Sequence, residues 1–526
     1  MTMSGLPDNL ESRLPQWPTG LAGRGLMLRH LEDMLRLPQT ADLTAAAHDL
    51  ALWRWQLMPW DQQTIAMVSA LGEISGRPSL PDWARKLQTQ VSAHFLEALK
   101  AISGGQTDRV ARLWRSHGAN SGHAVWLGET CLFFMQRGEE ALARVTLDSA
   151  RLPASHPVRT HLGALIAHCF DPPEIAIRST CQLPDDFHLI STLLEGQCLL
   201  RMGDRRGVDA LKNLRRAISW HPNLTLKLHD LMASQDSPAP ANARTAVLLY
   251  SWNNAELLQQ TLNSLSQSDL GDASVLVLDN GSSDRTPDVL CAAAEFFGNR
   301  LKYFSLPVNI GAPAARNWLL RHPETASFDT VVFLDDDVLL PHDWLSELNA
   351  QFRRAGKNAI VGCRILDQAP RQSVQTADVN LLDIEANGDF LIANAGGGEL
   401  DLGLHDYTRP CLSVTGCCHM MDRERAVELG GFDLRFNPSQ FDDFDLDLRN
   451  ALHGSHAVYV GGTAVRHCQR SSLNQADSEA KQGHIQGNML KLNTKYSATQ
   501  KAELLRKNRE LLWNDLLAKT RDLENM

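Results

Sequence analysis

The sequence predicts an α/β region with a mostly parallel sheet, preceded by an all-α N-terminal region and followed by a C-terminal helical segment. Residues 1 to about 235 are rich in Leu, Ala, Trp and Gln, and their apolar residues recur at three- and four-residue spacing, which indicates helices. From residue 245, short continuous apolar runs alternate with helical patterns, which is typical of parallel strands covered on both faces by helices. From about residue 475 the pattern is again helical, amphipathic and rich in Lys, Leu and Glu.

Residues 1–232 are therefore expected to form a helical domain. Within it, three similar stretches begin at Cys131, Ala164 and Gln197, a spacing of 33 residues each time. Each places a Gly, Pro or Asp turn between an apolar helix and an Ala/Leu-rich helix. This arrangement resembles a tetratricopeptide-type repeat of about 34 residues, beginning near residue 125. A plain helical bundle explains the pattern equally well, and the seven tryptophans in the first 126 residues are expected to pack in a core rather than line a glycan groove.

Residues 233–244 contain two prolines and two serines and are expected to be a linker. It separates the helical domain from an α/β domain at 245–474, and a C-terminal helical extension at 475–526 follows. Strands are expected at 245–250, 275–280, 302–306 and 331–337, and helices at about 255–265, after Pro287 and at 313–322. Asn254 is expected to cap the first of these helices and Asp284 to begin the second. Because ligands bind beyond the carboxyl ends of strands in such sheets, polar residues at these ends are candidate site residues.

The composition argues against some classes of protein. A net charge of −10 is unlike that of a dedicated nucleic-acid binder, which carries a basic stripe. No run of about eighteen apolar residues occurs, so no membrane span is expected. The N-terminus holds acidic and proline residues where a secretory signal would be apolar, and the ten cysteines include no CxxC pair. These observations predict a cytoplasmic protein with reduced, buried thiols.

Three adjacent acids, Asp335, Asp336 and Asp337, directly follow an expected strand. Carboxylates this close repel one another, which costs stability unless a cation lies among them. Their hard oxygen atoms suit magnesium or manganese, and such an ion would hold a diphosphate. A solvated acidic turn before the next helix is the alternative explanation.

Three further residues have weaker individual signals. Asp279, at the end of the second strand, could accept hydrogen bonds from a base or ribose, although the Asp-Asn-Gly-Ser sequence also favours a simple Asx turn. Arg316, in the segment NIGAPAARN that begins at Asn309, could reach a phosphate or pair with the acids. His467 ends another apolar strand, and a lone histidine in such a place is more often structural than a ligand.

The segment FDDFDLDLR, which begins at Phe441, combines several acids with apolar residues. On a helix, Asp442 and Asp445 share a face, and Asp445 and Arg449 form an i,i+4 pair. The apolar neighbours make this segment unsuited to a solvated face, so some of the carboxylates are expected to point into a cleft or a buried polar pair. A desolvated carboxylate has a raised pKa and therefore makes a good general base.

These motifs occur in a fixed order: YSWNN, Asp279, NxGxxxARN, DDD, TGCCHMMDRE, GGFD, FDDFDLDLR and a final His467. Together, over about residues 245–472, they resemble the nucleotide-sugar-binding GT-A domain of glycosyltransferase family 2. The N-terminal helical region is not part of this resemblance.

The resemblance implies roles for the residues that match the motifs. On the nucleotide side, the first loop contacts the nucleotide, the acid after the second strand recognises the base, usually uracil, and the NIGAPAARN segment lies near the diphosphate. These nucleotide-binding residues would be Tyr250, Ser251, Asn253, Asp279, Asn309 and Arg316. Around the chemistry, the metal-binding residues would be Asp335, Asp337 and His467. Asp336 would fill the variable middle position of the DxD motif beside the nucleotide sugar, and Gly416 would lie at the floor of the acceptor pocket. The general base would be Asp443, but Asp442 replaces the family's usual Glu, so either acid could act.

The function implied is an inverting, metal-dependent transfer from a nucleotide-diphospho-sugar, most simply a UDP-sugar, to an acceptor hydroxyl. The acceptor would be a glycan, a lipid-linked or a protein acceptor in bacterial surface glycan or flagellin-type glycosylation, and the helical region would bind a protein partner or self-associate. One alternative is a nucleotidyltransferase of sugar activation, although YSWNN offers no Gly-rich phosphate loop. A second is a non-catalytic helical-repeat adaptor, which the joint presence of DDD, FDDFD and His467 argues against.

Overall fold

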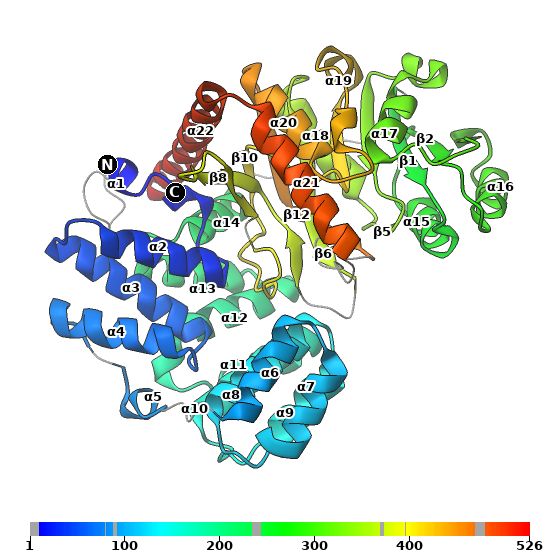
Figure 1. Ribbon diagram of the computed structural model, residues 1–526. Helices are drawn as coiled ribbons and strands as arrows, with labels where there is room; N and C mark the ends of the chain where they lie inside the picture. Colours follow the sequence, from blue (N-terminus) through cyan, green and yellow to red (C-terminus); the bar gives the residue numbers. More distant parts are fainter. Residues whose placement is uncertain are drawn as a thin grey trace.

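The computed structural model describes residues 10–78, 80–87, 92–233, 244–368, 373–394, 396–468 and 479–526. Figure 1 shows a helical lobe, formed by the N-terminal half of the chain, beside a lobe built around a large sheet. The predicted linker at 233–244 lies outside the described residues except for its two end residues. None of the described helices is both long and apolar enough to cross a membrane.

The helical lobe begins with helices that pack around buried tryptophans. The first helices are α1 (Leu10–Arg13), α2 (Arg24–Arg36), α3 (Ala41–Leu57), α4 (Gln62–Ser75), α5 (Asp82–Arg85), α6 (Ala93–Ser103) and α7 (Thr107–Leu113). The side chains of Trp17, Trp53, Trp55 and Trp60 are at most 1% exposed. The prediction that the tryptophans pack in a core is therefore confirmed for these four residues.

Three consecutive helix pairs follow at the predicted spacing. They are α8 (Ala124–Gln136) with α9 (Glu140–Ser149), α10 (Pro157–Phe170) with α11 (Pro173–Thr180), and α12 (His188–Arg201) with α13 (Arg206–Ala217). Gly138 and Gly203 turn the first and third pairs with a φ of +72°, a conformation that glycine adopts without strain. The turn of the second pair contains Asp171 and two prolines. A last helix, α14 (Pro222–Met232), leads out of the lobe.

The sheet of the second lobe has the order β10-β12-β6-β11-β4-β1-β2-β3. Its strands are β1 (Thr245–Ser251), β2 (Ser274–Asp279), β3 (Leu301–Ser305), β4 (Thr330–Leu334), β6 (Ile360–Asp367), β10 (Thr408–Cys411), β11 (Cys418–Asp422) and β12 (Ala457–His467). Short strands β5 (Val338–Leu339) and β7 (Val374–Thr376) pair with β12 and β6. The four predicted strands are confirmed and run parallel. The second and third are displaced by one residue, and the fourth covers 330–334 where 331–337 was predicted. β11 lies antiparallel between β4 and β6, and β6 is parallel to β12.

Helices cover both faces of the sheet, as the continuous apolar strands predict. In β1, Val247 and Leu249 face a core that includes α15 (Ala255–Gln267), α16 (Thr286–Phe297) and α18 (Trp344–Ala355). The alternate residues Ala246 and Leu248 face the other core, which includes α17 (Ala312–Arg321), α19 (Arg423–Glu428) and α20 (Asp442–Leu452). The loops at the strand ends are therefore held by two packed layers.

One helix cap differs from the prediction. Asn254 makes no side-chain cap to α15, because its side chain is hydrogen-bonded to Asp336 instead. The Ala255 N–H at the start of α15 donates to Asp284 Oδ2 at 3.0 Å, while Asp284 Oδ1 accepts from Thr286 N at 3.0 Å. Asp284 thus lies just before α16, which begins at Thr286 rather than at the predicted Asp284, and its carboxylate satisfies one N–H donor of each helix.

The C-terminal helices α21 (Glu479–Lys495) and α22 (Ala498–Asn525) pack back on the rest of the chain, as predicted. Figure 1 shows α22 beside the sheet lobe, and it contacts α14, β10, α20 and the hairpin of β8 (Val379–Ile384) and β9 (Phe390–Asn394). Trp513 Nε1 of α22 donates to the Pro15 carbonyl at 3.0 Å. α22 therefore contacts the segment between α1 and α2 of the helical lobe.

Candidate active site

Three consecutive acids follow β4, where the sequence predicts a ligand-binding edge of the sheet. Asp336 accepts hydrogen bonds from the Ser251 hydroxyl at the end of β1 and from Asn254. Burial and the neighbouring charge of Asp337 raise the pKa of Asp336 to about 7. Asp336 therefore contacts the end of β1 and the loop after it, whereas Asp335 and Asp337 contact other groups.

His467 ends β12 and lies beside two of these acids. Its Nε2 is 2.9 Å from Asp337 Oδ1 and 3.9 Å from Asp335 Oδ2. Its Nδ1 donates to Gln375 Oε1 at 2.7 Å, which orients the ring so that Nε2 faces the two carboxylates. Burial lowers the pKa of His467, but the hydrogen bond and charge of Asp337 outweigh burial and raise it overall. Two carboxylates and one imidazole are a donor set that fits a divalent cation such as Mn²⁺.

A thiol completes this cluster. Single donor atoms of Asp335, Cys417 and His467 all lie within 4.8 Å of one another. Cys417 is 4% exposed, and burial raises the pKa of its thiol well above the ordinary value.

Arg316, on the buried side of α17, joins the acids from different elements. Its Nη1 donates to Asp442 Oδ2 at 2.7 Å, and its Nη2 donates to Asp335 Oδ1 at 3.1 Å. The guanidinium carbon lies 5.6 Å from the ring centre of Tyr250 and 5.4 Å from that of Phe432. Arg316 is only 7% exposed, so it compensates the charges of two acids that water reaches poorly.

The structure separates the two acids at the start of α20. Asp442 is 2% exposed and is the acid paired with Arg316. Asp443 is half-buried, and its Oδ2 accepts a hydrogen bond from the Gly416 N–H at 2.6 Å. The two residues before the helix, Gln440 and Phe441, have φ values of +81° and +69°, which non-glycine residues rarely adopt. Such backbone strain is typical of functional sites.

The other acids of this helix have structural partners, as the apolar surroundings predict. Asp445 pairs with Arg449 at 2.9 Å and accepts from the Tyr496 hydroxyl at 2.8 Å. Asp447 Oδ1 is 2.9 Å from His419 Nε2, and its Oδ2 accepts from the Ser413 hydroxyl at 2.7 Å. These pairs hold α20 and leave Asp443 as the half-buried carboxylate beside Gly416.

The loops after β1 and β2 hold the residues that the sequence assigns to nucleotide binding. Asn253 Oδ1 accepts from the Ser283 N–H at 2.7 Å. Asp279 is 3% exposed, and its Oδ1 accepts from the Ser282 N–H at 2.9 Å, so the predicted Asx turn is present. Asn309 Oδ1 accepts from Asn280 Nδ2 at 2.9 Å, which ties the segment before α17 to the end of β2. The structure thus gathers these predicted residues at neighbouring strand ends.

Three residues near this site were missed by the sequence analysis. Trp252, between Ser251 and Asn253, is 51% exposed, which is unusual for so large an apolar side chain. Cys417 stands directly before β11, and Gln375 stands in β7. An apolar residue inside the YSWNN loop was a usable signal for Trp252, whereas Cys417 and Gln375 depend on strand pairing that the sequence does not show.

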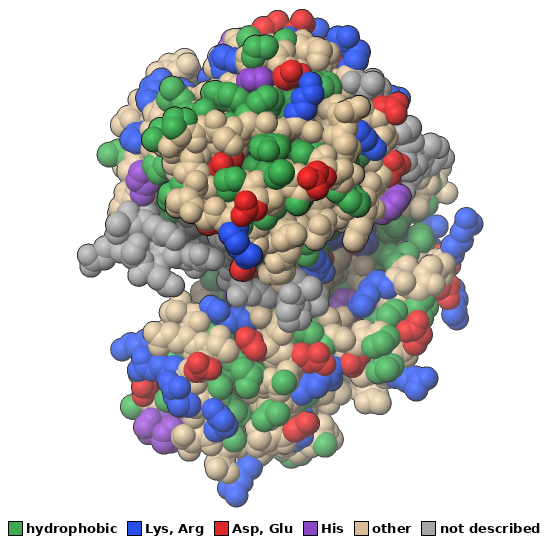
Figure 2. All heavy atoms as spheres, turned by 90° about the vertical axis from the view of Figure 1, so that its right-hand side faces the viewer, with side chains coloured by type: hydrophobic (Ala, Val, Ile, Leu, Met, Phe, Trp, Pro, Cys, Tyr) green, Lys and Arg blue, Asp and Glu red, His purple; other side chains and the backbone are tan. Residues whose placement is uncertain are grey.

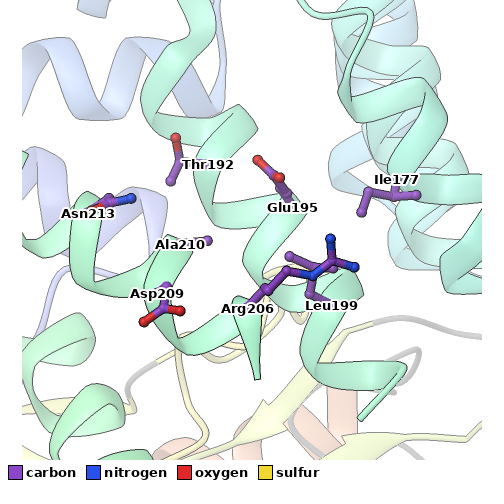
Figure 3. A pocket seen from close by; sticks show the side chains of 8 residues that line it. All are labelled: Ile177, Thr192, Glu195, Leu199, Arg206, Asp209, Ala210 and Asn213. Carbon is purple, nitrogen blue, oxygen red and sulfur yellow. The ribbon is translucent and has the colours of Figure 1, made fainter. Parts of the chain in front are cut away.

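A separate pocket of about 400 Å³ lies in the helical lobe, away from the acids. Figure 3 shows its lining from α11, α12 and α13, with Glu195 of α12 and Arg206 of α13 near each other. The remaining lining residues are Ile177, Thr192, Leu199, Asp209, Ala210 and Asn213. On the face in Figure 2, the basic and acidic side chains of the described residues are interspersed.

The sheet lobe matches a known family of proteins. Residues 246–424 match the model of the family described as Glycosyl transferase family 2. The chain is 29% identical over 280 residues to the O-antigen biosynthesis protein RfbC of Myxococcus xanthus, covering 51% of this chain and 21% of RfbC. It is 23% identical over 276 residues to the galactofuranosyltransferase GlfT2 of Mycolicibacterium smegmatis, covering 48% of this chain and 41% of that protein. The chain therefore spans less than half the length of these curated relatives.

Two solved structures are similar in part. The mannosyltransferase PcManGT from Pyrobaculum calidifontis, in complex with GDP-Man and Mn²⁺, is 19% identical with a TM-score of 0.38, covering 60% of this chain and 84% of that chain. GalNAc-T7 with UDP, GalNAc and Mn²⁺ is 14% identical with a TM-score of 0.36, covering 43% of each chain. The sheet of this chain, mostly parallel and covered on both faces, has the architecture predicted for a GT-A domain. Residues 246–424 are the part of the chain that matches glycosyltransferase family 2.

Proposed function

We propose that the chain transfers a sugar from a nucleoside-diphosphate sugar to an acceptor hydroxyl, with inversion at the anomeric carbon, in the assembly of a bacterial surface glycan. This proposal rests on one observation: a carboxylate suited to bind a metal ion and a carboxylate suited to act as a base both lie near Arg316. Asp335 belongs to the donor set that fits a metal ion, and Asp443 lies beside Gly416, whose carbonyl accepts from Arg316 Nη2 at 3.4 Å. A leaving-group site and a base are therefore adjacent, which is what a displacement at a sugar carbon needs.

Asp443 is the general base in this proposal. Asp442 is buried and its charge is used by Arg316, so it is poorly placed to take a proton from an incoming hydroxyl. Asp443 is half-buried, and its Oδ2 accepts from a backbone N–H, which fixes the direction of the carboxylate. A carboxylate held in this way can accept the acceptor's proton as the oxygen attacks.

The donor is held by the residues around β1, β2 and β4 in this proposal. Asp335, Asp337 and His467 would hold a divalent cation, which neutralises charge on the departing diphosphate when bound. One carboxylate oxygen of Asp279 forms the Asx turn. The other would accept a hydrogen bond from the base or the ribose. A uridine nucleotide is the proposed form. Asn253, Asn309 and Arg316 complete the nucleotide side of the cleft.

The relatives support the choice of acceptor and compartment. One is named for O-antigen biosynthesis and another as a galactofuranosyltransferase, and both are bacterial. A glycan or lipid-linked glycan hydroxyl is therefore the proposed acceptor. All ten cysteines are free in the structure, which supports a reducing compartment such as the cytoplasm.

The helix pairs α8 to α13 form a tetratricopeptide-like array in this proposal. Their support is the match between the 33-residue sequence spacing and the three observed helix pairs. Such an array offers an extended surface for a partner or an acceptor.

The first test measures nucleotide release by the purified chain from UDP-, GDP- and dTDP-sugars in the presence of Mn²⁺. Asp443→Asn is expected to reduce turnover at least about a hundredfold, because the amide cannot accept the proton, while affinity for the donor nucleotide stays near normal. Turnover is followed by coupled nucleotide detection, and affinity by calorimetry.

The matched control is Asp288→Asn, the same change at an exposed position of α16. It is expected to leave turnover unchanged. Retained turnover in Asp443→Asn would reject the assignment of the base. Absence of release from every nucleotide sugar by the unmodified chain would reject the proposed donor class.

A further inference from the structure

The candidate metal cluster contains a donor that a hard cation does not need. Besides two carboxylates and an imidazole, the Sγ of Cys417 lies within 4.8 Å of donor atoms of Asp335 and His467. Zn²⁺ bound tetrahedrally by sulfur, nitrogen and oxygen has neighbouring donors about 3.3 to 3.7 Å apart, given its usual bond lengths. The separations of the three donors, at most 4.8 Å, therefore exceed the spacing that Zn²⁺ requires by no more than about 1.5 Å.

The sheet holds Cys417 in this place. β11 pairs antiparallel with β4, with Cys418 opposite Leu334, so the next residues, Cys417 and Asp335, also face each other. The Asp335 N–H donates to the Cys417 carbonyl at 3.1 Å. On the other side of the cluster, β12 brings His467 to the same edge through its pairing with β6. The position of Cys417 is thus fixed by strand pairing.

The Cys417 thiol is also distinct from its neighbours. Cys418 and Cys363 are hydrogen-bonded to each other through their side chains. Cys417 is 4% exposed, and no hydrogen-bond partner of its thiol lies among the described residues. A buried sulfur that faces a carboxylate and an imidazole without a partner of its own is a ligand position.

We propose that this centre also binds a thiophilic divalent cation such as Zn²⁺, with Cys417 as a ligand beside His467 and Asp335. On binding, the thiol releases its proton to solvent and a sulfur–metal bond forms, so the bound ion gains one thiolate. The thiolate then takes a coordination position that a hard cation would fill with an oxygen ligand. This inference deepens the proposed function: hard cations, which favour oxygen ligands, support donor binding, whereas a thiophilic cation occupies the same centre through Cys417.

The test uses Cd²⁺, whose bond to a thiolate gives an ultraviolet charge-transfer absorption. Because Cys181 and Cys291 are exposed thiols, the full chain carries Cys181→Ser and Cys291→Ser as background substitutions. One equivalent of Cd²⁺ is expected to give the absorption in this background and to lose it in Cys417→Ser. Cys417→Ser is expected to weaken Cd²⁺ by at least about tenfold, whereas Mn²⁺ affinity, measured by electron paramagnetic resonance, changes by less than about twofold.

The matched control is Cys468→Ser, which removes the half-buried thiol next to His467. The absorption persists in this variant if Cys417 is the ligand. Absorption that persists in Cys417→Ser, absorption that disappears only in Cys468→Ser, or a parallel loss of Cd²⁺ and Mn²⁺ affinity would each overturn the inference. Mn²⁺ binding without a Cys417-dependent absorption rejects this inference alone. A Cys417-dependent absorption without Mn²⁺ binding supports the inference and rejects the metal site of the proposed function.

Discussion

At the residue scale, the buried guanidinium of Arg316 distinguishes the acids around it. Arg316 donates to Asp335, which directly follows β4, and to Asp442 of α20, so its guanidinium opposes the rise in pKa that burial causes in both acids. Burial raises the pKa of Asp442, while Arg316 opposes that rise. Asp443, one residue on, has a backbone donor in place of this pair. Two adjacent carboxylates therefore have different environments, which is how one helix start supplies a structural acid and a candidate base.

Gln375 gives the residue-scale prediction. It orients His467 through a hydrogen bond to Nδ1, and partners of this kind fix the ligand face of a histidine. Gln375→Ala is expected to weaken Mn²⁺ binding by roughly 10- to 100-fold, measured by electron paramagnetic resonance or calorimetry. Gln375→Glu keeps an acceptor oxygen and is expected to restore most of the affinity.

The control for this prediction is Gln260→Ala, the same change at an exposed position of α15. It is expected to leave Mn²⁺ affinity as it is. If Gln375→Ala binds Mn²⁺ as tightly as the unmodified chain, the imidazole does not depend on this hydrogen bond for its orientation.

The residues of the site differ in how far sequence reasoning reaches them. Asp335, Asp336 and Asp337 stand out because three acids directly follow an apolar strand. The choice between Asp442 and Asp443 stays open at that stage, because the partner that separates them, Arg316, lies 126 residues away along the chain. Cys417 and Gln375 carry no local signal, since their neighbours reach them only through pairing of distant strands.

At the element scale, local patterns predict individual strands and helices well. The four strands from β1 to β4 and the helix pairs of the N-terminal lobe follow from apolar runs, periodicity and turn residues. The insertion of β11 between β4 and β6, and the β8–β9 hairpin, do not follow, because they depend on contacts between segments far apart in sequence. The insertion is what brings Cys417 to Asp335, so the missed topology and the missed residue have one cause.

Two glycines in helices give the element-scale prediction. A Cβ at Gly207, in α13, would lie 2.7 Å from the Gly196 carbonyl oxygen of α12, whereas a Cβ at Gly487, in α21, meets nothing within 4 Å. Gly207→Ala is therefore expected to destabilise the protein by about 1–3 kcal/mol through overpacking. Gly487→Ala is expected to stabilise it by about 0.5–1 kcal/mol, because alanine loses less backbone entropy in a helix.

Chemical denaturation of the full chain measures both changes, and each variant is the control of the other. Helix propensity alone favours alanine at both sites, so two stabilising substitutions would show that α12 and α13 are not in the close contact described. A loss at Gly487 would show that α21 is packed more tightly on its neighbours than the open space around this glycine indicates.

At the scale of the whole molecule, the two lobes share a buried polar junction. Lys227 of α14 is 2% exposed, and its Nζ donates to Asp406 at 2.8 Å and to the Gly403 carbonyl at 2.8 Å. The Tyr407 hydroxyl donates to Asp378 at 2.8 Å and accepts from Asn223 of α14 at 3.4 Å. Burying charged and polar groups at this depth costs free energy unless all of them are paired. Either lobe alone would leave these groups exposed to solvent or without partners. The helical lobe is thus structurally joined to the sheet lobe through buried polar groups.

Arg409 of β10 gives the prediction for the whole molecule, because its fully buried side chain connects three segments. Its guanidinium donates to the Pro18 carbonyl at 2.6 Å and the Leu512 carbonyl at 3.2 Å, and Asp378 lies 3.8 Å away. Arg409→Met leaves buried carboxylate and carbonyl groups without their cation, so a loss of about 3–5 kcal/mol is expected. Tryptophan fluorescence, dominated by the helical lobe, and Mn²⁺ binding at the sheet lobe are expected to disappear at the same, lower denaturant concentration.

Arg244→Met, the same change in an exposed ion pair with Asp329, is expected to leave that concentration nearly unchanged. If fluorescence and Mn²⁺ binding were lost in two separate steps already in the unmodified chain, the junction would not couple the lobes, and the helical lobe would be a separately folding attachment.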